Sequence, residues 1–208
     1  MMNQIDDMIS KYCPKGVEYK ELGDICKISR GRVMSKDYLK ENLGEYPVYS
    51  SQTINNGMLG KIKTYDYDGE YLTWTTDGAN AGSVFYRNGK FSITKVCGLL
   101  ETKVNSVSMK YLSYYLGMVA KKYVNTGMGN PKLMSNVMSK IKVQVPPIEI
   151  QEEIVRILDS FTELENELEN ELEARQKQYE YYENKLLTFG KNVEYKKLIQ
   201  ICKILKGK

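Results

Sequence analysis

The longest periodic pattern of apolar positions in the chain runs from Pro146 to Phe189 and predicts one long helix. Its apolar residues recur at spacings of four and three, which is the seam of a coiled coil. Two spacings of four fall together at Leu164, Leu168 and Leu172, so the supercoil should straighten there. About forty residues at a rise of roughly 1.5 Å each give a rod about 60 Å long. The seam contains Ile150, Ile154, Ile157, Phe161, Leu164, Leu168, Leu172, Tyr179, Tyr182, Leu186 and Phe189, with Arg175 at a charged seam position.

Before this helix, short runs rich in β-branched and aromatic residues predict a domain built mainly of strands. The expected strands are Tyr46 to Ser50, Met58 to Tyr65, Glu70 to Thr75, Gly82 to Tyr86, Lys90 to Thr94, Cys97 to Thr102 and Ile141 to Val145. Residues that tolerate positive φ predict turns between them. These are Asn55-Asn56-Gly57, Asp68-Gly69, Asp77-Gly78 and Asn88-Gly89.

Three shorter segments carry a helical pattern. Met1 to Lys11 is weakly amphipathic, Val17 to Ser29 predicts a helical turn followed by a strand, and Ser108 is placed to cap a helix that continues to Tyr123. The expected fold class is therefore α+β, with one β-rich domain over residues 1–145 and a long coiled-coil helix over residues 146–190.

An internal repeat marks the last part of the chain. Gly16 to Arg32 and Asn192 to Lys208 align without gaps, with ten of seventeen positions identical, at a period of 176 residues. A period of this length is too long for a solenoid unit. We therefore expect residues 191–208 to be the start of a second, truncated copy of a module made of a domain and a rod.

Charge is distributed unevenly along the chain. The formal net charge is +4, but Ile150 to Ala174 contains nine acidic residues and one arginine, a net of −8, which leaves +12 on the other residues. A basic globular part joined to an acidic rod is compatible with nucleic-acid binding, although a solvated surface explains the same imbalance.

Composition excludes several kinds of site. The chain has no histidine, and its four cysteines, Cys13, Cys26, Cys97 and Cys202, form no close pair, so neither a zinc site nor a disulfide framework is expected. No apolar run approaches the length that spans a bilayer, and the N-terminus lacks the features of a signal peptide, which predicts a cytoplasmic protein without membrane contact.

Several long segments resemble the specificity subunit of type I restriction-modification enzymes. They are YPVYSSQTINNGMLG, GEYLTWTTDGANAGSVFYRNGKFSITKVCG, NPKLMSNVMSKIKVQVPPIEIQEEIVRILDSF and the VEYK repeat, which together cover essentially the whole chain. The resemblance implies a target recognition domain followed by a conserved helix, where the family has two of each and packs the two helices antiparallel. This chain departs from the family pattern because it has one recognition domain.

The family resemblance also implies a division of labour. Each recognition domain would read one half of a split double-stranded DNA target, while a methyltransferase (M) subunit and a restriction (R) subunit supply the chemistry. The sequence has no Asn-Pro-Pro-aromatic or Asp-Pro-Pro-aromatic motif, no glycine-rich turn for S-adenosylmethionine and no phosphate-binding loop. We therefore expect a non-catalytic, DNA-binding protein with no cofactor.

Three predicted loops combine residue types that read base edges with types that hold phosphates. The first runs from Tyr49 to Thr53 with Asn55-Asn56, the second is Thr75-Thr76-Asp77 with Asn80, and the third spans Asn125 to Ser135, with a basic cluster beside the first. The same asparagines and glycines are also ordinary turn formers. The proposed DNA-binding residues are Arg30, Arg32, Lys36, Tyr49, Ser50, Ser51, Gln52, Asn55, Asn56, Thr75, Thr76, Asp77, Asn80, Asn130 and Lys132.

Other functions remain open at this point. The chain could be a free-standing dimeric DNA-binding regulator, or a coiled-coil scaffold, which the basic domain disfavours. Asp77 followed by Glu101-Thr102-Lys103 also imitates the acidic residues and lysine of a metal-dependent nuclease, although such triplets are frequent.

The apolar seam predicts that the rod pairs with a second helix. Acids crowd Glu163 to Glu173, whereas Arg175, Lys177 and Lys185 follow, so parallel pairing would place acids against acids. We therefore expect a homodimer through an antiparallel coiled coil, with the tail of one copy near the Gly16 to Arg32 segment of the other.

Overall fold

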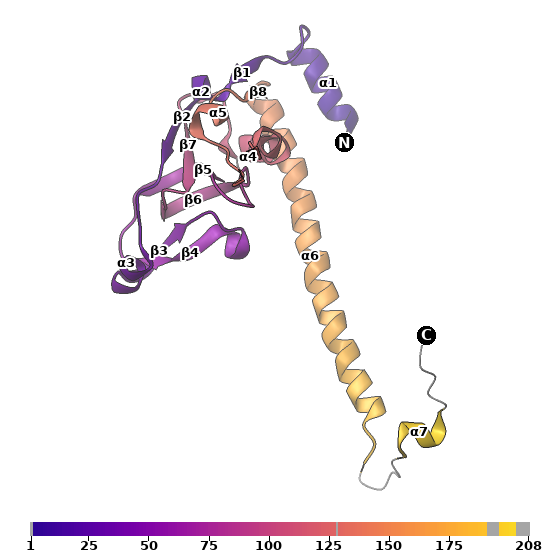
Figure 1. Ribbon diagram of the computed structural model, residues 1–208. Helices are drawn as coiled ribbons and strands as arrows, with labels where there is room; N and C mark the ends of the chain where they lie inside the picture. The colour runs from indigo at the N-terminus through magenta and orange to yellow at the C-terminus, as the bar shows by residue number, and fades with distance from the viewer. Residues whose placement is uncertain (1, 128, 191–195, 203–208) are drawn as a thin grey trace. The chain divides into compact units, whose positions relative to one another are not determined.

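The computed structural model describes residues 2–127, 129–190 and 196–202 (Figure 1). The chain divides into two compact units, Met1–Leu158 and Asp159–Lys208. The division falls inside helix α6 (Ile148–Leu187), whose first turns belong to the first unit. The architecture is α+β, as predicted, with sheets in the first unit and the long helix beyond them.

The described residues of the first unit form a large sheet and a small one. The large sheet has the strand order β2-β7-β5-β6-β3-β4, and its neighbours are antiparallel except β3 and β6, which are parallel. The small sheet pairs β1 with β8. The bounds are β1 Tyr19–Glu21, β2 Cys26–Arg30, β3 Leu43–Tyr49, β4 Met58–Ile62, β5 Tyr67–Thr75, β6 Val84–Ile93, β7 Cys97–Thr102 and β8 Lys142–Gln144.

Short helices precede, connect or follow these strands along the chain. In α4 the Ser108 hydroxyl accepts a hydrogen bond from the Tyr111 backbone N–H, as predicted for an N-cap, and Leu112 and Leu116 are buried. The bounds are α1 Met2–Tyr12, α2 Leu22–Ile25, α3 Lys36–Glu41, η1 Ile54–Gly57, α4 Met109–Val119, η2 Ala120–Tyr123, α5 Ser135–Met138 and α7 Leu198–Ile201.

The hydrophobic core consists of three clusters in the first unit. The main cluster contains Leu72, Trp74 and Leu100 together with buried residues of α2 and α4. A second contains Phe91, Ile93, Cys97 and Leu99, with three tyrosines packed against it, and a third lies between α3 and the β3–β4 hairpin. Cys26 and Cys97 are buried, whereas Cys13 is half-buried and Cys202 is exposed.

Trp74 and Gly98 face each other on β5 and β7 and pack closely. A Cβ atom at Gly98 would lie 2.1 Å from the Trp74 ring. Only glycine leaves room for the indole at this position.

Two predicted turns are wrong. Asp68-Gly69 and Asn88-Gly89 lie inside β5 and β6, so the segments expected as separate strands from Gly82 to Tyr86 and from Lys90 to Thr94 form one strand. Gly69 pairs with Gly89, and both have positive φ, 129° and 94°. The two strands remain paired on both sides of these glycines, from Tyr67 opposite Phe91 to Trp74 opposite Val84.

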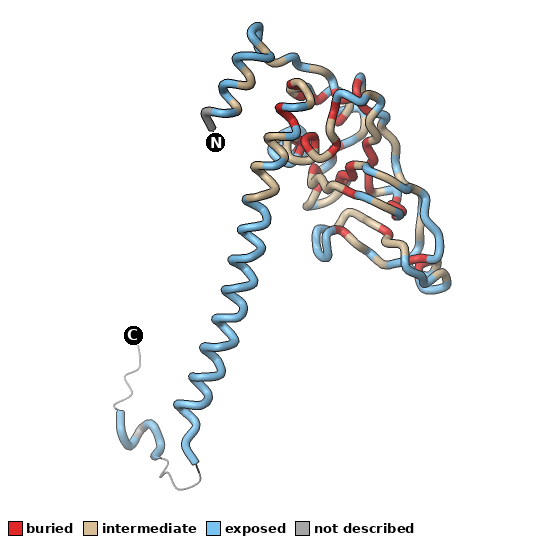
Figure 2. Tube along the Cα trace, turned by 180° about the vertical axis from the view of Figure 1, so that it is seen from behind, coloured by how far each residue is buried: buried red, intermediate tan, exposed pale blue. Residues whose placement is uncertain are grey.

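Helix α6 changes character along its length. Ile150 and Gln151 are buried, and the Gln151 side chain accepts from Ser108 N–H and donates to the Ser106 and Pro146 carbonyls at 2.9 and 2.7 Å. From Phe161 onward its residues are exposed (Figure 2). Leu164 and Leu168 are 53% and 66% exposed, so the described chain covers the start of the predicted seam, at Ile150, and leaves it exposed from Phe161 onward.

The described part of the second repeat repeats the local geometry of the first. Residues Leu198–Ile201 form a one-turn helix whose flanking residues, Lys197 and Cys202, have the backbone angles of their counterparts Glu21 and Cys26 within about 5°. Leu22 is buried, whereas its counterpart Leu198 is 64% exposed. The rest of the predicted repeat, residues 191–195 and 203–208, lies outside the described residues.

Candidate nucleic-acid interface

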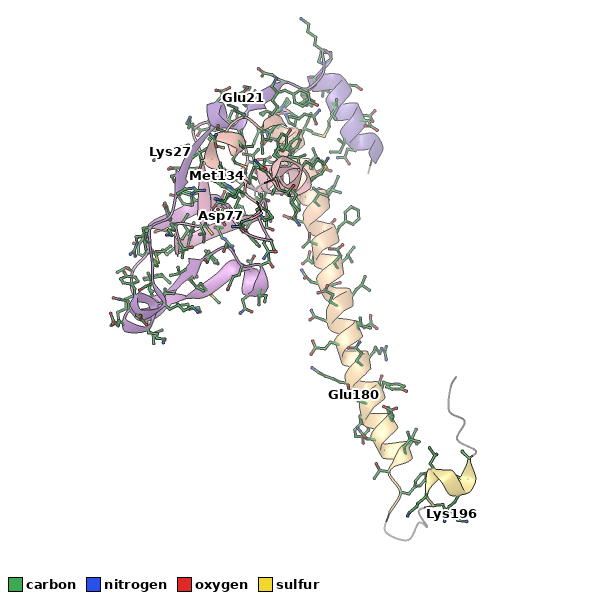
Figure 3. All side chains as sticks on the ribbon, viewed as in Figure 1. Glu21, Lys27, Asp77, Met134, Glu180 and Lys196 are labelled. Carbon is green, nitrogen blue, oxygen red and sulfur yellow. The ribbon has the colours of Figure 1, made fainter. Side chains whose placement is uncertain are left out.

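The second and third predicted loops lie against each other. Lys132 forms β-bridges with Asp77 and with Asn125, and Gly78 N–H donates to the Pro131 carbonyl at 3.0 Å. Figure 3 labels Asp77 and Met134, from these two loops, in the same part of the domain. The chain therefore brings together two segments that are about fifty residues apart in the sequence.

Trp74 anchors the third loop to the core. Its indole Nε1–H donates to the Leu133 carbonyl at 2.9 Å, and Leu133 N–H donates to the Thr76 carbonyl at 2.9 Å. Both Trp74 and Leu133 are fully buried. The segment that carries Asn130 and Lys132 is therefore held by a rigid part of the sheet.

The first loop joins the second through the turn between β6 and β7. Thr94 N–H donates to the Tyr49 carbonyl at 2.9 Å, and its hydroxyl donates to the Ser50 hydroxyl at 3.0 Å. On the other side of this turn, the Val96 carbonyl accepts from the backbone and the hydroxyl of Thr76. This turn thus links the first loop to the second, and the second loop in turn contacts the third at Thr76 and Gly78.

The first loop has an unusual backbone. Asn55, Asn56 and Gly57 have φ angles of 51°, 54° and 80°, three successive residues in the left-handed region. Ser50 N–H donates to the Gly57 carbonyl at 2.9 Å, and the Gln52 side-chain amide donates to the Met58 carbonyl. The predicted turn is confirmed, and it exposes Asn55 and Asn56.

Arg30 and Arg32, from the predicted basic cluster, differ in their partners. Arg30 is exposed and its Nη2 lies 3.4 Å from the Met134 sulfur, next to the third loop. Arg32 donates to the Asp66 carboxylate at 3.0 Å and to the Tyr38 hydroxyl at 3.2 Å, and these contacts raise the pKa of Arg32. Arg30 therefore keeps more of its charge available to a ligand than Arg32.

The predicted site residues differ in exposure. Thr75 and Thr76 are buried, and the Thr76 hydroxyl lies 2.6 Å from the Asp77 carboxylate. These two threonines support the loop and do not reach its surface. Exposed are Arg30, Arg32, Lys36, Asn55, Asn56, Asn130 and Lys132, and half-buried are Tyr49, Ser50, Ser51, Gln52, Asp77 and Asn80.

Sequence reasoning missed a buried arginine under the first loop. Arg87 lies on β6, is 3% exposed, and donates to the Thr73 hydroxyl at 3.1 Å and to the Asn56 carbonyl at 2.7 Å. Burial lowers the pKa of Arg87 to about 10, so the guanidinium is charged at neutral pH. No sequence signal marked Arg87, because it lies between the end of a predicted strand at Tyr86 and the predicted turn at Asn88-Gly89.

The nuclease-like residues are not assembled. Asp77 follows Thr75, which pairs with Cys97 at the start of β7. Glu101 lies four residues after Cys97 on β7, so the distance from Cys97 to Glu101 is roughly 13 Å at the usual rise per residue. Glu101 instead forms an ion pair with Lys27 at 3.4 Å. Within residues 2–127, 129–190 and 196–202, no three His, Cys, Asp or Glu residues cluster as metal ligands do.

Over the same ranges, no helix is long and apolar enough to cross a membrane.

Comparison with known proteins gives concordant results. The profile of the family described as "Type I restriction modification DNA specificity domain" matches residues 14–174. The chain is 47% identical over 173 residues to the specificity subunit of the type I restriction enzyme MpnII of Mycoplasma pneumoniae, covering 81% of this chain and 52% of that protein. Another M. pneumoniae protein, named as a type I specificity subunit, is 48% identical over 183 residues, covering 86% of this chain and 60% of its own length.

Solved structures share the fold. The crystal structure of a type I restriction-modification S subunit from M. genitalium aligns with a TM-score of 0.64 at 17% identity, covering 82% of this chain and 47% of that one. The HsdS subunit from Thermoanaerobacter tengcongensis aligns with a TM-score of 0.57 at 17% identity, covering 81% and 45%. The chain thus spans about half the length of these proteins.

Proposed function

Because the chain belongs to the type I restriction-modification DNA specificity family, we propose that it reads one half of a bipartite double-stranded DNA target. The observation that carries the proposal is that hydrogen bonds join the three polar loops, the first to the second through Thr94 and Val96, and the second to the third at Thr76 and Gly78. Exposed amides at Asn55, Asn56 and Asn130 can read base edges. Arg30 and Lys132 beside them can hold phosphates.

The division of labour follows from the same family membership. The chain binds DNA and catalyses no reaction, while an M subunit methylates and an R subunit cuts. The M subunit docks near the start and the end of α6, around Glu149 to Arg156 and Tyr179 to Phe189. Co-purification with an M subunit would distinguish this assembly from a free-standing dimeric regulator that uses the same DNA surface.

The rod pairs with the rod of a second copy in an antiparallel homodimer. Its exposed stripe, which includes Phe161, Leu164 and Leu168, is the surface that a partner helix covers. Arg175 and Lys177 already contact Glu171 and Glu173 within the helix. Antiparallel pairing adds Glu163 of the partner to the same positive region, whereas parallel pairing would bring the acidic segments together.

The salt dependence of DNA binding tests the proposed surface. Neutralising Arg30, Arg32, Lys36 and Lys132 with glutamine should lower the slope of log affinity against log salt by roughly one unit for each phosphate that the chain no longer neutralises. Asn130→Ala or Gln52→Ala should instead change which sequence is preferred. The affinity is measured with double-stranded oligonucleotides between about 50 and 200 mM salt.

A matched control removes the same charge elsewhere. Lys11, Lys15, Lys140 and Lys142 lie on α1, on the turn after it and next to or within β8, and their replacement by glutamine should leave the slope nearly unchanged. Equal slopes for the two quadruple variants would mean that the three loops are not the DNA-binding surface.

A further inference from the structure

The strongest unexplained feature of the domain is the buried charge of Arg87. Burial of a guanidinium is costly unless a carboxylate or several hydrogen bonds compensate it. Among the described residues no carboxylate forms an ion pair with Arg87, and its Nη1 atom is buried without a hydrogen-bond partner. A stable core does not need this charge, which points to another role for the side chain.

The guanidinium contacts parts of the first loop on two sides. Its Cζ atom lies 3.5 Å from the centroid of the Tyr49 ring, which is a stacking arrangement. Nη2 donates to the Asn56 carbonyl at 2.7 Å. A Cβ atom at Gly57 would lie 3.1 Å from Nη2, so the backbone of the loop rests directly on the guanidinium.

The other end of this network is fixed in the sheet. Nε donates to the hydroxyl of Thr73, which is 1% exposed on the central strand β5. Thr73 pairs with Leu99 on β7 and Phe85 on β6, so it cannot move without the sheet. Arg87 therefore connects a rigid strand to a loop in which Asn55 and Asn56 are held in the left-handed region, a conformation that is costly for residues other than glycine.

The chemistry of arginine explains why another side chain does not suffice. The planar guanidinium stacks on an aromatic ring with its face while its edge donates in two fixed directions. Lysine keeps the charge but lacks the plane, and methionine keeps the bulk but donates nothing. Both substitutions would leave the Asn56 carbonyl without its present donor.

We propose that Arg87 is a specificity-positioning residue: it sets the conformation of residues 49–58 so that Asn55, Asn56 and Gln52 present one arrangement to DNA. This inference rests on the proposed DNA-reading function. Arg87 touches no DNA itself, because it lies beneath the loop. Its loss therefore changes base preference without removing a phosphate contact.

Hydrogen exchange of the loop tests the positioning step without DNA. Ser50 N–H donates to Gly57 O and Met58 N–H donates to Asn55 O, so both amides report loop opening. In the full chain, Arg87→Lys should speed their exchange by about tenfold, the effect expected when one charge-assisted hydrogen bond is removed. Leu99 and Leu100 in β7 should exchange as before, and Arg175→Lys on the rod is the matched control.

Selection from a pool of double-stranded oligonucleotides with a randomised centre tests the specificity step. Wild type should enrich one motif, and Arg87→Lys should alter or flatten that motif at a few positions while the salt slope stays constant. If Arg87→Lys does not fold, Thr73→Val removes the acceptor of Nε with little change in shape and should cause a smaller change of the same kind.

The outcomes are distinguishable. If folded Arg87→Lys enriches the same motif as wild type, the inference is overturned and the proposed function stands. The same holds if the amide hydrogens of Ser50 and Met58 exchange at the wild-type rate. A motif abolished together with a slope lowered by one unit would make Arg87 a direct phosphate contact and would also overturn it. If wild type enriches no motif, the proposed function fails, and this inference fails with it.

Discussion

The recognition domain and the distal part of α6 use apolar residues in opposite ways. In the domain, large side chains such as Trp74, Phe91 and Leu112 are buried in the core clusters. Along α6, Leu164, Leu168 and Leu172 recur every four residues on one side of the helix, yet each is more than half exposed. The domain therefore carries its own core, whereas the rod exposes the apolar stripe that the proposed partner helix would cover.

The largest expected effect falls on the domain. Gly98→Ala places a methyl group against the Trp74 ring, and overpacking of this kind should lower the free energy of unfolding by about 3 kcal/mol. Urea unfolding followed by tryptophan fluorescence measures the loss. Gly60→Ala is the matched control, because a Cβ atom there meets nothing within 4 Å. Similar stabilities of the two variants would mean that the β5–β7 packing is not tight.

A substitution in the exposed stripe of α6 should weaken dimerisation and leave the fold of the domain unchanged. Leu168→Asp puts a charge into the predicted helix interface, and it should weaken dimerisation by at least about 100-fold, or roughly 3 kcal/mol. Light scattering across a concentration series measures this change, with Asn166→Ala on the same helix as the control. A wild-type monomer at micromolar concentration, or an unaffected Leu168→Asp dimer, would contradict pairing through the seam.

Alkaline pH should also separate the two regions. Burial raises the pKa of Cys26 and of Cys97 from about 9 to about 12, so unfolding releases their protons once the pH exceeds 9. The folded state then binds more protons than the unfolded state, and the stability of the domain falls as the pH rises, by about 1 kcal/mol for each thiol at pH 10. Urea midpoints at pH 8 and pH 10 measure the loss.

Arg87 changes the stability in the opposite direction. Because its pKa is lowered to about 10 in the folded state, its contribution to the free energy of unfolding rises with pH, but only above about pH 10. Between pH 8 and pH 10 the change in stability therefore comes mainly from the thiols of Cys26 and Cys97. Replacing Cys26 and Cys97 by alanine should flatten the pH dependence, even though it lowers stability overall. An unchanged dependence in that double variant would assign the alkaline loss to other groups.

The smallest expected effect concerns the ion pairs of the rod. Lys177 contacts Glu173 at 2.6 Å, and both side chains are more than 60% exposed, so Lys177→Gln should cost only about 0.3 kcal/mol. Thermal unfolding of the helix by circular dichroism measures it. A loss of stability several times larger would mean that Lys177 also contacts acidic residues of a partner helix, as the antiparallel arrangement predicts.

Local patterns predicted most of the elements but not their arrangement. The four-three spacing from Ile150 to Leu172 predicted α6, and the Ser108 cap predicted the start of α4, because both depend on neighbours along the chain. The strand order, with β3 parallel to β6, depends on contacts between distant segments. The turn chemistry of Asn88-Gly89 was misread because its consequence depends on Gly69 across the sheet.

The candidate site shows the same limit. Polar loops with turn residues could be identified from composition, and the fold joins them through main-chain hydrogen bonds that composition does not reveal. Thr75 and Thr76 have suitable side chains but are buried, and Arg32 is engaged by Asp66. Arg87 was missed because only the folded loop shows that its charge lies beneath a candidate reading element.

The arrangement of half-sites in selected DNA shows whether the domain reads DNA and whether the rod holds two such domains apart. The full chain is used to enrich binding sequences from double-stranded DNA with a long randomised centre. The account predicts two inverted copies of one motif separated by a gap of constant length, because an antiparallel pair of rods presents two identical domains related by a two-fold axis. A single motif, or two copies at variable separation or in direct orientation, would contradict it.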